Sequence, residues 1–253
     1  MIRNDNTSPS GVGGAMIFSA GLGTRFKPWT DLHPKALALV KGKSLLQRNI
    51  EYLQQYEIKD VIVNVHHFAD QVEEAIQKNK GWGSKVIISD ERNELLDTGG
   101  GLLKAKKFFT PGERFITCNA DILTDLDINK LISFHEQHKA IISFGVTDRK
   151  TSRYLLLDES NRLCGWRNSK TSDEKISIPK SNLTQMAYSC VVVFEYGIFR
   201  LMEEAGFSGK FSLIDVYLRL SADHLIMGYD HTGDRLVDVG RLESVAVAES
   251  LFP

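Results

Sequence analysis

Short apolar runs alternate with amphipathic stretches through the first 150 residues of this 253-residue chain. The runs of strand length are residues 15–20, 60–65, 85–89, 114–121 and 140–146. Apolar residues at helical spacing predict helices between them, over residues 45–56, 70–79, 101–109 and 127–138. Four β-α units in succession require right-handed crossovers and a mostly parallel sheet. The predicted fold class is therefore α/β, a Rossmann-like, mostly parallel sheet flanked by helices. Ser44 and Asp70 are expected as N-caps of two of these helices.

The alternation of strand and helix ends after about residue 150. Two short strands are expected in a hairpin that turns at Ser160-Asn161, and a stronger strand covers residues 186–194. The remaining expected elements are helices at 199–205 and 212–221, a strand pair at 224–229 and 235–240, and a helix at 242–252. Because no linker or repeat divides the chain, we expect one domain over residues 15–253, with a smaller lobe over about 151–253. The polar residues 1–14 predict a flexible leader.

Composition excludes several classes of partner and site. The chain has 31 Lys and Arg residues against 32 Asp and Glu, so its net charge of −1 gives no support to nucleic-acid binding. The three cysteines form no CxxC pair and suit a reducing compartment better than a disulfide framework. No apolar stretch reaches the roughly 18 residues of a membrane span. We therefore expect a cytoplasmic protein without nucleic-acid or membrane partners, while the oligomeric state stays open.

A glycine-rich loop follows the first expected strand. Residues 21–25 read Gly-Leu-Gly-Thr-Arg, and glycines in such a position let backbone N–H groups approach an anion closely. The dinucleotide fingerprint GxGxxG does not fit, because Phe26 stands where its third glycine is required. The P-loop pattern ending in Gly42-Lys43-Ser44 does not fit either, because Leu37 stands where its first glycine belongs. The loop therefore predicts phosphate binding of another kind.

The longer arrangement resembles a known family. Residues 21–25, followed by Pro28 and by Pro34-Lys35, are similar to the signature of sugar-1-phosphate nucleotidyltransferases, also called NDP-sugar pyrophosphorylases. Three further segments resemble later motifs of that family in the same order: residues 95–105, 119–121 and 237–250. The likeness is greatest to the small single-domain type of N-acetylmuramate-1-phosphate uridylyltransferases and mannose-1-phosphate guanylyltransferases. It implies the nucleotide-diphospho-sugar transferase fold, with a nucleotide-binding half over about 15–150 and a sugar-binding half over about 151–253.

The resemblance also implies a reaction and a set of site residues. An NTP and a sugar-1-phosphate would give an NDP-sugar and pyrophosphate with the help of Mg²⁺, in cell-envelope sugar metabolism. The residues in catalytic positions are Arg25 and Lys35. Those in nucleotide-binding positions are Ala20, Gly21, Gly23, Thr24, Gly99, Gly100 and Asn119. The Mg²⁺ ligands would be Asp121 and Asp238.

The sequence departs from the family pattern where the sugar and base are chosen. Asp97 replaces a Glu of the subgroup, and Arg241 replaces the Thr after Asp-Val-Gly. The usual mid-chain lysine of the sugar side has no clear match, and the candidates are Arg167, Lys170 and Lys175. UTP is the first expectation for the nucleotide and GTP the second. Residues 154–182 predict either a flap that closes over the sugar phosphate or a solvated surface segment.

Two other functions remain open from the sequence. A metal-dependent glycosyltransferase has a similar sheet and an Asp-x-Asp metal motif, which residues 125–127 (Asp-Leu-Asp) match literally. Asp127 also stands where it would cap the following helix, which offers a structural reason for its presence. The second alternative is a non-catalytic nucleotide-sugar sensor. Retention of Arg25, Lys35, Asp121 and Asp238 together disfavours it.

Overall fold

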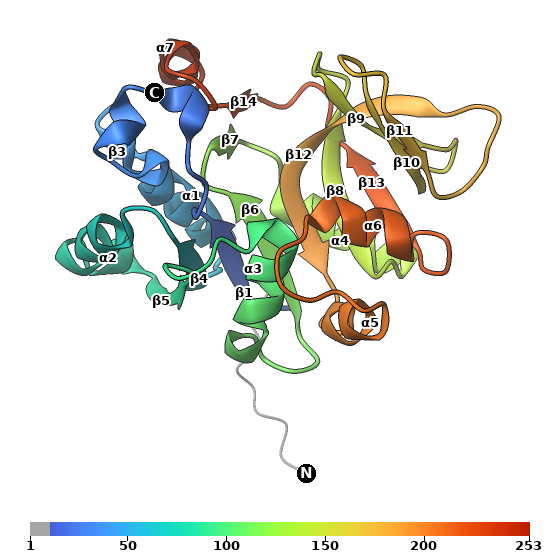
Figure 1. The fold of residues 1–253 in the computed structure, drawn as a ribbon, viewed down its shortest axis with the longest axis horizontal. Helices are drawn as coiled ribbons and strands as arrows, with labels where there is room; N and C mark the ends of the chain where they lie inside the picture. The colour runs from blue at the N-terminus through green and yellow to red at the C-terminus, as the bar shows by residue number, and fades with distance from the viewer. Residues whose placement is uncertain (1–10) are drawn as a thin grey trace.

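A computed structural model describes residues 11–253, which form a large mixed sheet with helices on both faces (Figure 1). The strands are β1 Val12–Phe18, β2 Leu39–Val40, β3 Lys43–Ser44, β4 Asp60–Val65, β5 Lys85–Asp90, β6 Arg114–Asn119, β7 Ile122–Thr124, β8 Ile142–Thr147, β9 Arg153–Leu157, β10 Leu163–Asn168, β11 Glu174–Ile176, β12 Thr184–Phe194, β13 Ile226–Asp230 and β14 Leu236–Asp238. The α-helices are α1 Leu45–Gln54, α2 Ala69–Lys78, α3 Asp97–Ala105, α4 Ile128–His138, α5 Ile198–Glu204, α6 Leu213–Leu220 and α7 Glu243–Leu251. The α/β class predicted from the alternation of strands and helices is confirmed.

The main sheet has a parallel half and a mixed, mostly antiparallel half that meet at β12. Its order is β11-β10-β9-β12-β6-β1-β4-β5, and β8 pairs with both β12 and β13. Strands β6, β1, β4 and β5 run parallel, as expected for successive β-α-β units. The long strand β12 runs antiparallel to β6, β8 and β9 and thereby joins the two halves. The segment expected as a flap or a surface loop forms one end of the main sheet, with β11 at its edge and β10 and β9 next to it.

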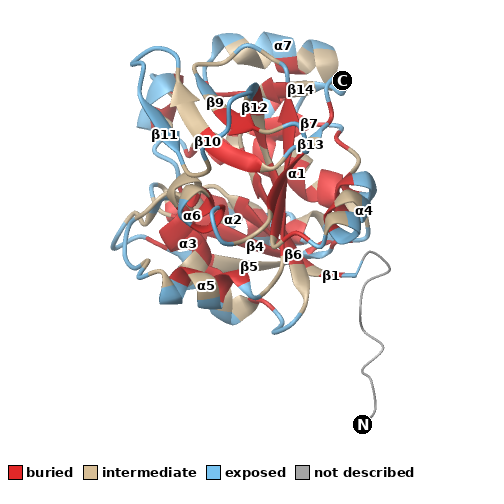
Figure 2. Cartoon of the chain, turned by 90° about the vertical axis from the view of Figure 1, so that its right-hand side faces the viewer, coloured by how far each residue is buried: buried red, intermediate tan, exposed pale blue. Residues whose placement is uncertain are grey.

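Alternate residues of the strands point to two separate layers of the core. Ala15 and Ile17 of β1 pack in the layer covered by α1, α2 and α4, whereas Met16 packs in the layer under α3, α5 and α6. A third cluster of buried apolar side chains lies apart from both layers. It joins Phe26 and Leu45 near the first loop to Val239 and to Ala248 of α7. Figure 2 shows the buried residues concentrated in the central strands and the exposed ones on the outer sides of the helices.

Several local predictions differ from the structure. The last three residues of the expected leader belong to β1, because Val12 is buried and pairs with Arg114 of β6. The first ten residues of that leader lie outside the described part of the chain. Ser44 is confirmed as the N-cap of α1, since its Oγ accepts from the Gln47 N–H at 3.1 Å. Asp70 is not a cap but lies in the first turn of α2, which begins after Phe68 in a left-handed conformation.

The two strands expected near the C-terminus are present, but they do not pair with each other. Strand β13 pairs in parallel with β8 in the main sheet, whereas β14 pairs with β7 in a separate two-stranded sheet. The two strands therefore belong to different sheets. Among the helices of residues 11–253, none has both the length and the apolar character needed to cross a membrane.

Helix α3 begins four residues earlier than expected because its glycines pack tightly against another segment. The N–H groups of Gly99 and Gly100 both donate to the Phe211 carbonyl, at 2.9 and 3.3 Å. A Cβ on Gly100 would lie 2.1 Å from the Gly209 carbonyl oxygen, so only glycine fits there. This close approach brings the start of α3 against the segment that leads into α6.

Substituting Gly100 with alanine should therefore destabilise the protein. The added methyl group meets backbone rather than a flexible side chain, so we expect a loss of about 3 kcal/mol in the free energy of unfolding. Gly197→Ala is the matched control, because a Cβ there meets nothing closer than Ile141 Cδ1 at 3.8 Å. Denaturant unfolding measures both variants. Equal stability of the two would contradict the packing described here.

Candidate functional site

The loop between β1 and α1 is built around Gly23. Its φ of 61° lies in the left-handed region, and a Cβ there would lie 2.9 Å from Thr30 Cγ2 and 3.2 Å from Lys35 Cβ. The Thr30 hydroxyl donates to the Gly23 carbonyl at 2.9 Å and fixes the turn. Gly21 differs, since a Cβ there would meet no atom within 4 Å. Its backbone is open to the space in front of the loop.

This loop forms one wall of a cleft of about 420 Å³ at the carboxyl ends of the parallel strands. The cleft is lined by seven of the residues predicted for the site: Ala20, Gly21, Gly23, Thr24, Lys35, Asn119 and Asp121. They come from three segments that are distant in the sequence. The structure therefore brings the predicted glycine loop, lysine and Asn-Ala-Asp segment together around one cavity.

The two predicted metal ligands are brought together by a short strand pairing. Strand β14 pairs antiparallel with β7, with Asp238 opposite Ile122, and the Val239 N–H donates to the Asp121 carbonyl at 2.8 Å. Lys35 Nζ lies 2.5 Å from Asp121 Oδ2 and offsets its charge. Asp238 Oδ1 is buried and has no hydrogen-bond partner among residues 11–253.

Asp238 is held in an environment that disfavours its charged form. Burial and the nearby Asp121 carboxylate raise the pKa of Asp238, while Lys35, Arg25 and Arg149 act in the opposite direction. A buried carboxylate oxygen without a partner, next to a second carboxylate, suits an oxygen-preferring cation such as Mg²⁺. Within the described chain, no group of three or more His, Cys, Asp or Glu side chains is placed to hold a metal. The candidate is therefore a two-carboxylate site completed by ligands from outside the protein, as is usual for Mg²⁺ with phosphates.

Arg25 lies close to Asp238, beside Gly240. A Cβ on Gly240 would lie 2.7 Å from Asp238 Oδ1 and 3.1 Å from an Arg25 guanidinium nitrogen, so Gly240 leaves room for both. Arg25 also lines an open cleft of about 650 Å³ together with Arg241, Glu243, Ser244 and Val247. Arg241, which departs from the family pattern, thus lies beside the predicted catalytic arginine.

A further cavity, of about 350 Å³, adjoins the first one on the side of the smaller lobe. Both cavities are bordered by Asp97, Thr98 and Asn119, and Asp238 lines the second. The cations that line this second cavity are Arg149 and Arg153, which the sequence did not predict as site residues. The signal that could have found Arg149 is its place two residues beyond β8, at the strand edge where ligands bind.

The mid-chain cations expected on the sugar side lie elsewhere. Arg167 forms an ion pair with Glu174, and Lys175 Nζ lies 2.9 Å from Asp215 Oδ1. Lys170 is exposed. None of the three lines either cavity. The positions of these side chains therefore give the expectation no support, because two are paired on the protein surface and the third lines neither cavity.

Gly99 and Gly100 also differ from their predicted role. They line neither cavity, and their N–H groups are already bonded to Phe211. The residues of this segment that face the cavities are Asp97 and Thr98 at the start of α3. The glycines serve to dock the helix that carries them.

A buried carboxylate, Glu91, was not predicted. It lines the first cleft, accepts from Asn64 Nδ2 at 2.7 Å and from the Leu96 N–H at 3.2 Å, and burial raises its pKa. Asn64 in turn accepts from the Ser19 N–H at 2.7 Å. This chain of hydrogen bonds ties the end of β1 to the segment before α3 and stiffens the floor of the cleft.

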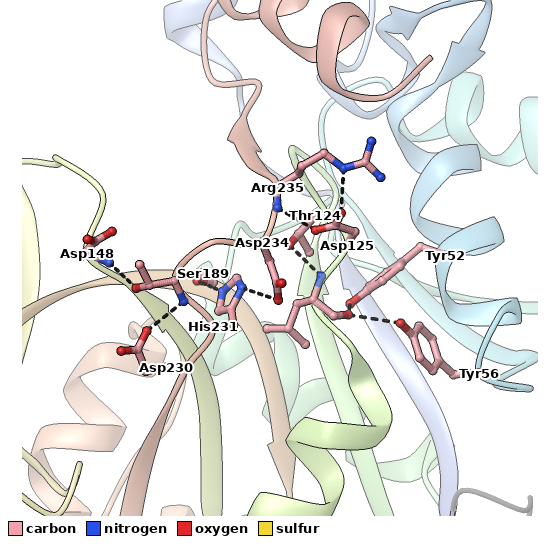
Figure 3. A network of polar contacts seen from close by, with 12 residues as sticks. Tyr52, Tyr56, Thr124, Asp125, Asp148, Ser189, Asp230, His231, Asp234 and Arg235 are labelled. Carbon is pink, nitrogen blue, oxygen red and sulfur yellow. Dashed lines mark hydrogen bonds and ion pairs between the residues drawn. The ribbon is translucent and has the colours of Figure 1, made fainter.

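The two carboxylates of the segment that matches Asp-x-Asp, residues 125–127, already make structural contacts. Asp127 caps α4, accepting from the N–H groups of Asn129 and Lys130 at 2.9 and 3.3 Å. Asp125 Oδ2 lies 2.7 Å from Arg235 Nε (Figure 3). Both carboxylates are therefore already used, which removes the residues on which a glycosyltransferase metal motif depends.

Comparisons with known proteins bear on the family of this chain. A family model described as nucleotidyl transferase matches residues 14–164. The chain is similar to an N-acetylmuramate alpha-1-phosphate uridylyltransferase of Caulobacter vibrioides, with 41% identity over 104 residues that cover 40% of this chain and 43% of the relative. It is also 28% identical, over 90% of its length, to 52% of a bifunctional sugar-1-phosphate nucleotidylyltransferase/acetyltransferase of Sulfurisphaera tokodaii. The chain thus spans about half the length of these curated relatives.

The fold is shared with solved structures. HddC from Yersinia pseudotuberculosis, solved in complex with GMP-PN, superposes with a TM-score of 0.73 at 22% identity. The match covers 96% of this chain and all of that one. This confirms the predicted nucleotide-diphospho-sugar transferase type of fold.

The raised pKa of Asp238 predicts how the stability of the ligand-free protein changes with pH. A carboxyl whose folded pKa exceeds its unfolded value is penalised when ionised, so it costs stability above the folded pKa and nothing below the unfolded one. In EDTA at neutral pH, Asp238→Asn should therefore melt higher than the wild type. The difference should shrink to zero as the pH falls below the ordinary carboxyl pKa.

Scanning calorimetry between acidic and neutral pH measures this difference. Asp223→Asn is the matched control, since that carboxylate is exposed at the surface and its loss should leave the difference small at every pH. An Asp238→Asn variant that melts below the wild type at neutral pH would contradict the account of Asp238 as an uncompensated buried carboxylate.

Proposed function

The chain belongs to the nucleotidyl transferase family, and we propose that it joins an NTP and a sugar-1-phosphate into an NDP-sugar, with release of pyrophosphate. The observation that carries the proposal is the cluster of charged residues between two adjoining cavities: Lys35 and Asp121 line the first, Asp238 lines the second, and Arg25 lies near Asp238 beside Gly240. One cavity is bordered by the glycine loop and suits a nucleotide. The other extends into the smaller lobe and suits a sugar phosphate.

The nucleotide is proposed to be UTP, with GTP second. The support for UTP is the likeness to the Caulobacter uridylyltransferase, which is the more identical of the two relatives described above. The support for GTP is weaker because it comes from family members of lower identity. N-acetylmuramate-1-phosphate and mannose-1-phosphate are the corresponding sugar phosphates to test first. A cytoplasmic location and a place in cell-envelope sugar metabolism remain predictions from the sequence.

Asp121 and Asp238 are proposed to hold Mg²⁺ when substrates are bound. The ion would supply charge neutralisation and orientation at the phosphates. Its support here is the buried, unpartnered Asp238 Oδ1 beside Asp121, together with the fit of a two-carboxylate site to an ion that also binds phosphate.

The protein's own residues supply positioning and positive charge. In the reaction, an oxygen of the sugar phosphate forms a bond to the α-phosphorus while the bond to the departing pyrophosphate breaks. Lys35 and Arg25, both close to the two aspartates, offset negative charge as it moves to the leaving group. The open backbone at Gly21 allows the triphosphate to approach the loop closely. No general acid or base is required, because the attacking phosphate oxygen is already ionised.

An assay of pyrophosphate release tests the proposal directly. The protein is incubated with each NTP, Mg²⁺ and a panel of sugar-1-phosphates, and pyrophosphate is measured. We expect release only when a sugar-1-phosphate is present, with UTP the best nucleotide, and none in EDTA. Transfer from a finished NDP-sugar to an acceptor would favour a glycosyltransferase. Binding of NDP-sugar without turnover would favour a sensor.

Substitution of Lys35 should remove most turnover. Losing one charge contact at a transferring phosphate costs a few kcal/mol, on the order of 10²-fold in rate. We therefore expect the rate of pyrophosphate release to fall by about that factor in Lys35→Ala and in Arg25→Ala. Lys27→Ala is the matched control, because Lys27 belongs to the same loop but pairs with Asp31 at 2.8 Å and lines neither the cleft of Lys35 nor that of Arg25. Steady-state rates of pyrophosphate release measure all three. Near-normal rates in Lys35→Ala would remove Lys35 from the catalytic residues.

A further inference from the structure

Arg149 is a half-buried cation of the sugar-side cavity that forms no ion pair with a carboxylate of residues 11–253. One of its terminal guanidinium nitrogens donates to the Tyr188 carbonyl at 3.1 Å. Its Nε is buried and lacks a hydrogen-bond partner among the described residues. Asp238 feels its charge, yet no ion pair joins the two side chains. A guanidinium withdrawn from water without an anion is unfavourable unless a ligand supplies the anion.

The cations of the smaller lobe differ from Arg149 in their partners or their position. Arg162 also has a buried Nε without a partner, but it donates to the Ser221 carbonyl at 2.8 Å and does not line the cavity. Arg167 and Lys175 are neutralised by Glu174 and Asp215. Arg153 lines the same cavity as Arg149 but is exposed, so water already solvates its charge. Arg149 therefore differs from the remaining candidates in being both inside the cavity and unpaired.

The segment that carries Arg149 is held in place by the loop after β13 (Figure 3). The His231 N–H donates to the Val146 carbonyl at 3.0 Å, and the Asp148 N–H donates to the Thr232 hydroxyl at 3.0 Å. These bonds fix the chain on either side of Thr147, directly before Arg149. The arginine thus extends from an anchored backbone.

The same loop also holds the strand that faces Arg149. Ser189 Oγ and His231 Nε2 are hydrogen-bonded at 2.7 Å, and both side chains are buried (Figure 3). The register of β12 against β8 shifts between Tyr188 and Val192, and Cys190 in this bulge has a φ of 59°. Bulges of this kind re-aim backbone groups near active sites. Here the bulge lies next to the Tyr188 carbonyl that receives the arginine.

We propose that Arg149 binds the phosphate group of the sugar-1-phosphate, in place of the mid-chain lysine of related enzymes. This inference rests on the proposed function, since it names the residue that holds the second substrate. A guanidinium presents two parallel N–H donors to a phosphate, whereas an ammonium acts as a single point charge. The position beside Asp238 also lets Arg149 reduce repulsion between that carboxylate and the incoming phosphate.

Kinetics with the two substrates varied separately test the assignment. The panel consists of N-acetylmuramate-1-phosphate, mannose-1-phosphate and glucose-1-phosphate, and the most active member is used. In Arg149→Ala the KM for the sugar phosphate should rise roughly ten- to hundredfold, while the KM for the NTP stays unchanged. Arg149→Lys should recover only part of the loss. Arg167→Ala is the matched control and should behave as the wild type.

A binding readout separates this inference from the proposed function. Inorganic phosphate at millimolar concentration should raise the melting temperature of the wild type and of Arg167→Ala, but not of Arg149→Ala. This measurement needs no turnover, so it tests Arg149 even if the wild type releases no pyrophosphate and the proposed function fails. An unchanged KM for the sugar phosphate in a folded Arg149→Ala protein would overturn the inference. So would equal stabilisation of all three proteins by phosphate.

Discussion

The pairing of β7 with β14 is the contact on which the candidate site depends. These strands are short, yet they bring the end of the chain back to the end of β6 and place Asp238 beside Asp121. The third apolar cluster supports this closure, because Val237 and Val239 pack against Phe26 and Leu45 near the glycine loop. A loop, a strand end and the C-terminal segment are thus fixed against one another before any ligand binds. Preorganisation of this kind is what a reaction between two polyanions requires.

Several charged groups of the site have no ion-pair partner within residues 11–253, and bound phosphates and a cation would supply such partners. Asp121 is paired with Lys35, whereas the half-buried Asp238 has a buried Oδ1 without a partner, and burial and Asp121 raise its pKa. Arg25 and Arg149 both lower the pKa of Asp238 by their charge, but neither forms an ion pair with it among the described residues. Each unsatisfied group costs stability in the free protein and gains a partner when anionic substrates and a cation enter. The site therefore gives up stability for function, as active sites often do.

Local motifs in the sequence predicted much of the fold and the first cleft. Strands and helices of the parallel half follow from apolar periodicity, and the Ser44 cap follows from a residue type with one strong local role. What the sequence missed depends on distant contacts. Gly99 and Gly100 read as a ligand loop, but the backbone of residues 209–211 makes them a packed helix start. Arg149 belongs to no motif that the sequence shows. Its proposed role in phosphate binding depends on a β-bulge and a loop that only the tertiary structure brings beside it.

The central claim is that one site, assembled by the β7–β14 pairing, holds the nucleotide and the metal together. A crystal structure with a non-hydrolysable UTP analogue and Mn²⁺, with anomalous scattering recorded for the metal, tests this most directly. The account predicts an anomalous peak between the carboxylates of Asp121 and Asp238 and a triphosphate against the backbone of residues 20–24. A nucleotide bound outside the glycine-loop cleft, or a metal peak away from both carboxylates, would contradict it.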